Sequence, residues 1–187
     1  KTLAYLKREP RTEKRMPIGF SEEMIREILS YFSIDLLSDV VEISETTRKN
    51  IIDALTKATE LGYGIEDTIK LITDPTITRM RARLIARTET VTAANKAADI
   101  SARKTGLVLQ KTWIAGKDNR TRHDHRNVDG TTLDVDTPFN VGGYDMMQPG
   151  DRGTKGNPTP AKEICNCRCT VGYRGKRDAN GRLLRQS

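Results

Sequence analysis

The chain has few cysteines, few aromatic residues and no long apolar run, and each shortage narrows the possible classes of protein. Only three cysteines stand among its 187 residues, and Cys165, Cys167 and Cys169 all lie within five positions. Residues two apart on a strand are too distant for easy disulfide geometry, so we expect reduced thiols and a cytosolic origin. The apolar stretches span a few residues each, such as "LVL" at 107–109, which excludes a membrane span.

Several recognisable signals are also missing. The N-terminal stretch "KTLAYLKREPRTEKRMP" has neither a signal-peptide pattern nor an initiator methionine, which fits a fragment of a longer chain or a fusion. No H-E-x-x-H, Walker-type glycine loop or G-x-S-x-G elbow occurs. Aromatic residues make up 5% of the chain and no recognition-helix module is visible, which argues against base-specific reading of nucleic acid.

Positive charge, in contrast, is abundant and concentrated in one stretch. The net charge is +7, yet residues 79–126 hold 12 Lys and Arg against 4 Asp and Glu, which is +8. The remainder therefore sums to 20 minus 21, or −1. A local basic stripe is typical of a nucleic-acid footprint, but a solvated helix face or a surface for an acidic partner has the same composition.

The first half of the sequence predicts helices. Apolar residues recur at helical spacing, and capping serines and helix-ending glycines bound the segments at Ser21, Ser44, Gly62 and Gly106. The predicted helices cover residues 21–32, 44–61, 65–73 and 77–105. On the last of these we expect an apolar face of Met80, Leu84, Ala94, Ala98 and Ala102. Four arginines, Arg79, Arg81, Arg83 and Arg87, crowd its positive end, so we expect Glu89, other acidic side chains or a bound polyanion to compensate them.

After Gly106 the period changes from helical to alternating. We expect strands over residues 107–115, 131–139 and 164–173, with a turn-rich loop at 116–131 and irregular chain at 140–163. The expected fold class is α+β, with N-terminal helices followed by a small loop-rich domain that has a long helix and a short, mainly antiparallel sheet. We divide the chain into a helical segment (1–77), a core (78–175) and a basic tail (176–187).

Both histidines of the chain lie in the loop "DNRTRHDHRNVDG". His123 and His125 beside Asp124 and Arg122 have the composition of a general-base or metal site, as a nuclease would require. The structural alternative is a loop that is hydrogen-bonded to the sheet through arginine and histidine, and we favour it.

The thiols allow similar alternatives. Alternation over "ICNCRCTVGY" predicts that Cys165, Cys167 and Cys169 share one face of a strand, where cysteine packs as a small apolar side chain. A zinc clip that joins Cys167 and Cys169 to the histidine loop is the alternative, and it requires four nitrogen or sulfur ligands. A nucleophilic cysteine is less favoured, because nothing singles one out.

The ordered set "IARTET", "TWIAGKDNRTRHDHRNVDG", "PF" with "GG", "PGD" and "NCRCTV" resembles the phage Mu F-type minor head proteins, also called phage head morphogenesis proteins. The resemblance covers about residues 79–173. It implies a structural role for the motif residues Arg87, Glu89, Trp113, Asp118, Arg120, Arg122, His125, Gly130, Asn166, Cys167, Arg168 and Cys169, and no catalytic residue.

The resemblance also bears on the metal question. Relatives carry a cysteine pair at the positions of Arg122 and His125 and a histidine at that of Ile164, a set that resembles a zinc site. This sequence departs from that set, so we expect no cofactor and a metal-free clip in which Arg122 and His125 hydrogen-bond near the cysteine strand. In the zinc alternative, His125, Cys167 and Cys169 are the ligands, with His123 or Cys165 as the fourth.

The resemblance implies a structural virion protein near the portal that acts in head morphogenesis and in handling the packaged DNA. Its expected partners are the portal protein and other head subunits, with several copies in each particle and assembly in the host cytoplasm. Arg79, Arg81, Arg83 and Arg87 are the candidate contacts for DNA, without sequence preference, or for an acidic partner. The alternatives are a nuclease or toxin-like enzyme centred on residues 122–125 and a zinc-stapled DNA-binding module.

Overall fold

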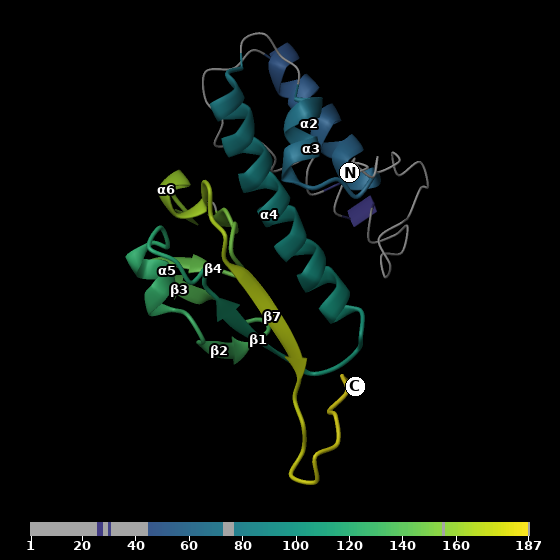
Figure 1. Ribbon diagram of the computed structural model, residues 1–187. Helices are drawn as coiled ribbons and strands as arrows, with labels where there is room; N and C mark the ends of the chain where they lie inside the picture. The colour runs from purple at the N-terminus through teal and green to yellow at the C-terminus, as the bar shows by residue number, and fades with distance from the viewer. Residues whose placement is uncertain (1–25, 28–29, 31–44, 73–76, 155, 187) are drawn as a thin grey trace, which may run out of the picture.

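The protein is built around one long helix, α4 (Arg79–Arg103), which lies between two shorter helices and a β-rich half (Figure 1). The computed structural model describes residues 26–27, 30, 45–72, 77–154 and 156–186. Of the helix expected over 21–32, residues 26, 27 and 30 are described and are helical, and the rest, like the Ser44 cap, lies outside the described residues. The predicted α+β class is confirmed.

The helices begin and end close to where the sequence predicts. The two helices before α4 are α2 (Glu45–Glu60) and α3 (Ile65–Leu71). Thr78 caps α4 by accepting a hydrogen bond from the Arg81 N–H at 3.3 Å. Gly106, with φ of +65°, follows the end of α4 in the left-handed conformation that favours glycine.

One apolar cluster joins the three helices. Its buried members from α2, α3 and α4 include Ile51, Leu55, Ile69, Ile85 and Ala86. The cluster spans the boundary that we placed at residue 77, because α4 supplies part of it. The division of the chain into three parts remains a prediction.

The apolar face that we expected on α4 is wrong. Met80 and Leu84 are 85% and 42% exposed, and Ala94 is exposed as well. The buried side of the helix instead carries small and polar residues, namely Ala82, Ile85, Ala86, Thr88, Glu89, Thr92, Ala93, Asn95, Ala97 and Asp99. A search for apolar periodicity misses this side because half of its residues are polar groups that bond to other parts of the fold.

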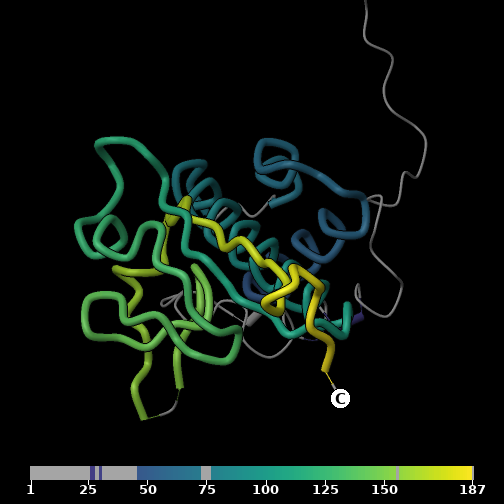
Figure 2. The backbone as a smooth tube through the Cα atoms, turned by 90° about the horizontal axis from the view of Figure 1, so that it is seen from below, coloured from purple at the N-terminus to yellow at the C-terminus, as the bar shows by residue number. Residues whose placement is uncertain are grey.

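The β-rich half centres on a three-stranded antiparallel sheet in the order β2–β1–β7. Its strands are β1 (Leu109–Ile114), β2 (Thr132–Asp134) and β7 (Thr170–Gly175). Trp113 pairs with Val171 in the register between β1 and β7. Figure 2, viewed from below, shows β7 running beside α4, and the residue contacts between the two elements agree.

The stretch that we expected to be irregular contains short elements. Two hairpins and one helical turn occur there: β3 (Phe139–Val141) with β4 (Tyr144–Met146), β5 (Gly153–Thr154) with β6 (Asn157–Pro158), and α6 (Ala161–Ile164). The expected strand over 131–139 is divided between β2 and β3. Single turns and two-residue strands are too short for periodicity to reveal.

The C-terminal stretch pairs with the residues that precede β1. The Val108 N–H donates to Leu184 O at 3.0 Å, and the Gln186 N–H donates to Gly106 O at 2.9 Å. The residues after β7 therefore extend the hydrogen bonding at the edge of the fold. No helix in the described part of the chain is both long and apolar enough to cross a bilayer.

Candidate functional site

The loop predicted to hold both histidines contains a short helix that separates them. This helix, α5 (His123–Asn127), has about one turn, and residues two apart on a helix point to different sides. His125 is 1% exposed, whereas the side chain of His123 is 78% exposed and shares a hydrogen bond with Asn127. The two histidines therefore do not form a single site.

The cysteine segment is not a continuous strand, so that prediction is wrong. Cys165 caps the end of α6, and β7 begins only at Thr170. Asn166 has a φ of +58°, which breaks the alternation between Cys165 and Cys167. Its backbone N–H donates to Thr88 Oγ1 at 2.8 Å, and its side-chain oxygen accepts from Arg87 at 3.0 Å. Helix α4 thus fixes the turn that separates Cys165 from the other two cysteines.

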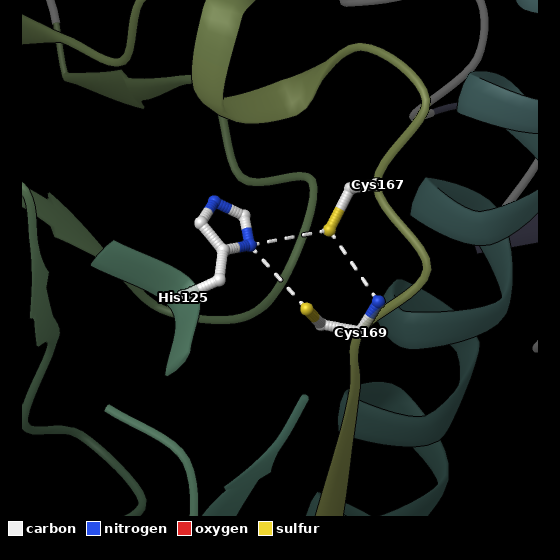
Figure 3. A group of neighbouring side chains, drawn as sticks. All are labelled: His125, Cys167 and Cys169. Carbon is white, nitrogen blue, oxygen red and sulfur yellow. Dashed lines mark hydrogen bonds between the residues drawn. The ribbon is translucent and has the colours of Figure 1, made fainter. Parts of the chain in front are cut away.

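Three buried side chains meet beneath α5: His125, Cys167 and Cys169 (Figure 3). The His125 Nδ1 lies 3.3 Å from Cys169 Sγ and 3.5 Å from Cys167 Sγ. The opposite ring nitrogen, Nε2, lies 3.1 Å from an oxygen of Glu163, a residue that is 3% exposed. Neither His123 nor Cys165 belongs to this group of three, and none of the three cysteines forms a disulfide.

The two buried thiols have opposite pKa shifts because they hydrogen-bond to each other. The hydrogen bond from Cys167 lowers the pKa of the Cys169 thiol, and His125 and the Gly116 N–H lower it further against the effect of burial. The same hydrogen bond and burial raise the pKa of Cys167.

Arginine and aspartate contacts surround the cluster. Arg122 donates to Cys165 O, which ties the start of α5 to the cysteine segment. Arg168 binds both oxygens of Asp118, at 2.6 and 2.7 Å, and Asp118 also accepts from the Arg120 N–H at 3.0 Å. Although desolvation opposes the shift, the Arg168 guanidinium holds the pKa of Asp118 below its usual value. These motif residues join the histidine loop to the cysteine segment.

Trp113 is the fully buried anchor beside the cluster. Its ring packs edge-on against His125 and Phe139, with centroid distances of 5.5 and 5.3 Å. Its carbonyl accepts from the Gly130 N–H at 2.9 Å, and Gly130 turns the chain with a φ of +75°. The tryptophan and the glycine of the motif thus position α5 against β1.

The buried polar side chains of α4 contact the residues on the other side of this site. Glu89 is 3% exposed at its side chain and pairs with Arg152 at 3.0 Å, and Asp99 accepts from the Tyr173 hydroxyl at 3.2 Å. Burial, followed by the charge of Asp99, raises the pKa of Tyr173. Asn95 lies between Glu89 and Asp99 on the helix. Its side-chain amide hydrogen-bonds to Pro149 and to residues 169–171.

Two arginines near the start of α4 have partners in other segments of the fold. We expected Glu89, other acidic side chains or a bound polyanion to compensate them. Arg83 pairs with Glu66 at 2.9 Å, and Arg87 donates to Asn166. Glu89 pairs with Arg152. The prediction that acidic side chains compensate the helix arginines therefore holds for Arg83, through Glu66.

The basic stretch is less open than its composition suggests. Outside the stretch, Glu27 pairs with Lys104 at 3.2 Å, and Asp136 pairs with Arg103 at 2.7 Å. Arg79 is exposed at the start of α4, and Arg81 is half-buried. Part of the local positive excess is thus balanced by acids from other segments of the fold.

Lys111 is a buried base in the middle of β1. It is 1% exposed, and its Nζ donates to Met147 O at 2.9 Å and lies 5.1 Å from the centre of the Phe139 ring. Burial lowers its pKa to about 8. No sequence pattern indicated this lysine, because the alternation of β1 is the same whether the inward side chain is lysine or an apolar residue.

The buried Lys111 predicts a pH-dependent stability. Between pH 8 and the ordinary lysine pKa, the unfolded chain binds the proton that the folded chain has lost, so the free energy of unfolding rises with pH. Lys111→Met removes this effect. Since one pKa unit corresponds to about 1.4 kcal/mol, we expect the variant to have a free energy of unfolding a few kcal/mol higher than wild type below pH 8. Urea unfolding at pH 7, 8, 9 and 10 measures the difference. Lys117→Met, at an exposed loop lysine, is the control. The prediction is contradicted if the difference in free energy of unfolding between wild type and Lys111→Met stays constant with pH.

The site is arranged for holding segments together. Both nitrogens of the buried histidine have partners, and the exposed histidine lies on the other side of α5. Sequence reasoning identified His125, Cys167, Cys169, Arg122 and Asp118. It missed Glu163 and Asn95, for which the available signal was weak: a glutamate just before the first cysteine and an asparagine within an alanine-rich helix.

Comparisons with known proteins agree with this arrangement of motifs. The Phage Mu protein F-like family matches residues 49–172, which cover most of the chain from α2 to β7. The chain is 36% identical over 95 residues to Minor head protein GP7 of Bacillus phage SPP1, which is 50% of this chain and 29% of that protein. The chain therefore belongs to the Phage Mu protein F-like family of minor head proteins, and the resemblance found in the sequence is confirmed.

Two bacterial proteins are also similar. Uncharacterized protein YqbB of Bacillus subtilis is 31% identical over 138 residues, covering 72% of this chain and 44% of that protein. NAD(+)--arginine ADP-ribosyltransferase EFV of Enterococcus faecalis is 30% identical over 134 residues, covering 70% of this chain and 26% of that protein. The chain thus spans less than half the length of each of these relatives. No solved structure matches it.

Proposed function

We propose that this chain is a structural component of a phage head, located near the portal, that acts in head morphogenesis and in handling the packaged DNA. The family match over residues 49–172 carries the proposal, supported by the similarity to a phage minor head protein. The partners that we propose are the portal protein and other head subunits, with several copies in each particle. Assembly takes place in the host cytoplasm, and the finished protein resides in the virion.

The contacts of the motif residues support a structural role over an enzymatic one. Arg122, Asp118, Arg168 and His125 all bind other parts of the chain, which leaves them committed to the fold. The similarity to an ADP-ribosyltransferase covers 26% of that enzyme and keeps an enzyme as the second candidate. We propose that this chain is not an enzyme. Turnover of DNA or NAD by the purified chain, abolished by His123→Ala with the fold intact, would overturn that proposal.

We expect binding to DNA to depend on salt and not on sequence. Arg79 and Arg83 are exposed at the start of α4, where backbone N–H groups also favour a phosphate. For a site that neutralises two phosphates, we expect the affinity for random duplex DNA to fall about tenfold between about 50 and about 200 mM salt. Fluorescence anisotropy with wild type and Arg79→Glu measures this, with Lys162→Glu, an exposed lysine on α6, as the control. Equal effects of the two variants would remove the start of α4 as the contact.

The location in the particle is tested with phage that carries this chain. We expect the protein in purified virions, at a few copies per portal ring, and still with the heads after the DNA has been released. A deletion should lower the yield of infectious particles more than the yield of portal protein. Quantitative mass spectrometry of particles measures the copy number. Absence of the chain from every particle fraction would overturn the proposal.

A further inference from the structure

We propose that His125, Cys167 and Cys169 bind a zinc ion that links α5 to the segment leading into β7. This inference goes beyond the proposed function and does not depend on it. It favours the zinc alternative over the metal-free clip that we expected from the sequence, and it rests on the way in which the three side chains converge.

The first support is the spacing of the donor atoms. Zinc binds sulfur at about 2.3 Å and histidine nitrogen at about 2.0 Å, so tetrahedral angles place each nitrogen about 3.5 Å from each sulfur. The two Nδ1–Sγ distances are 3.3 and 3.5 Å, and all three donor atoms lie within 4.8 Å of one another. A single ion therefore reaches all three with little movement of the chain.

The second support is the orientation of the histidine. Metal-binding histidines commonly donate their other N–H to a carboxylate, which fixes the tautomer and directs the free lone pair at the metal. Glu163 lies 3.1 Å from Nε2 and is itself buried, so its carboxylate oxygen accepts a hydrogen bond from the Nε2–H. The lone pair on Nδ1 then points between the two sulfurs (Figure 3). Glu163 is thus a positioning residue for the ligand.

The third support is the arrangement of hydrogen bonds around the two sulfurs. Without a metal, the one lone pair on Nδ1 faces two sulfurs, at 3.3 and 3.5 Å, and can accept a hydrogen bond from only one of them. A zinc ion engages all three donor atoms at once. Cysteine binds zinc as the thiolate, so the bulk solvent takes up the protons that the thiols release. The Cys169 N–H points at Cys167 Sγ from 3.4 Å, a contact that stabilises negative charge on that sulfur.

Two soft sulfurs and an imidazole favour zinc over magnesium or calcium, which prefer oxygen ligands. Within the described chain no fourth His, Cys, Asp or Glu joins this group. We therefore assign the fourth ligand to a water molecule. His123 and Cys165, the two candidates considered from the sequence, stand outside the group and serve as controls.

The first test measures zinc in the full chain, prepared without a histidine tag and under reducing conditions. We expect about one zinc per chain after incubation with zinc chloride and dialysis, as for a single tetrahedral site. Cobalt chloride should give sulfur-to-metal charge-transfer and tetrahedral d–d absorption. His125→Gln, Cys167→Ser and Cys169→Ser should lose both signals, whereas the matched controls His123→Gln and Cys165→Ser should keep them. Wild type without zinc or cobalt absorption, or equal loss in the controls, would overturn the proposal.

A second variant keeps the test decisive if the ligand variants fail to fold. Glu163→Gln retains all three ligands and removes the buried negative charge beside Nε2. We expect its zinc affinity, measured by competition with a chromophoric chelator, to fall by about 10–100-fold. Glu66→Gln, an exposed glutamate on α3, should leave the affinity unchanged. Equal affinities of Glu163→Gln and wild type would show that the histidine is not held as a ligand, and the proposal would fail.

Discussion

Asn95→Leu is expected to lower the free energy of unfolding by about 3–5 kcal/mol, because each buried polar group left without a partner costs about 1–3 kcal/mol. Asn95 is 2% exposed and uses both ends of its amide. Its Nδ2 donates to Pro149 O at 3.1 Å and to Cys169 O at 3.2 Å. Its Oδ1 accepts from the Thr170 hydroxyl at 3.0 Å and from the Val171 N–H at 3.3 Å. The amide thus takes the place of a neighbouring strand at the free edge of β7.

The matched control is Asn127→Leu, the same substitution at an exposed asparagine on a helix, where we expect a change within about 1 kcal/mol. Urea unfolding followed by far-UV circular dichroism compares the two variants. Asn95→Asp adds a more conservative test, since it keeps the acceptor oxygen but turns the donor that faces two carbonyls into a second acceptor. If Asn95→Leu costs no more than Asn127→Leu, the amide does not hold the edge of β7.

Local signals were sufficient to predict α4. Gly106 ends the helix predicted over residues 77–105, and the structure places α4 at Arg79–Arg103. Which side of it is buried was not predictable from apolar spacing. The buried side includes threonines, Asn95, Glu89 and Asp99, and these polar groups become buried because distant segments supply their partners. The partner of Glu89 is Arg152, 63 residues further along the chain.

The candidate site, like α4, was predictable from the sequence only in part. The sequence indicated that the histidine loop and the cysteines belong together, and the structure brings His125 to Cys167 and Cys169. It did not reveal that Cys165 is separate. The backbone of Asn166 is in the left-handed conformation and interrupts the extended chain, but the cysteines still stand at alternate positions in the sequence. Glu163 was missed for a related reason, since a glutamate on a single helical turn carries no sign that it will be buried.

The second large effect is expected at Gly150, in the "PGD" motif that passes over α4. Gly150 is buried with a φ of +89°, and a Cβ there would lie 2.4 Å from Thr92 Oγ1 and 3.0 Å from Thr92 Cα. Alanine therefore meets two penalties, a backbone strain of about 1–2 kcal/mol and an overpacking cost of about 1–3 kcal/mol. We expect Gly150→Ala to lower the free energy of unfolding by about 2–5 kcal/mol in urea titrations.

Gly143 separates the two penalties. Its φ is +91°, nearly that of Gly150, but a Cβ there would meet no atom within 4 Å. Gly143→Ala should therefore show the backbone strain alone, and the difference between the two variants measures how tightly the motif packs on α4. Adding Thr92→Ala to Gly150→Ala should recover only part of that difference, because the backbone Cα of residue 92 still lies in the way. Equal losses for Gly143→Ala and Gly150→Ala would mean that the motif glycine is required for its turn and not for its close approach to the helix.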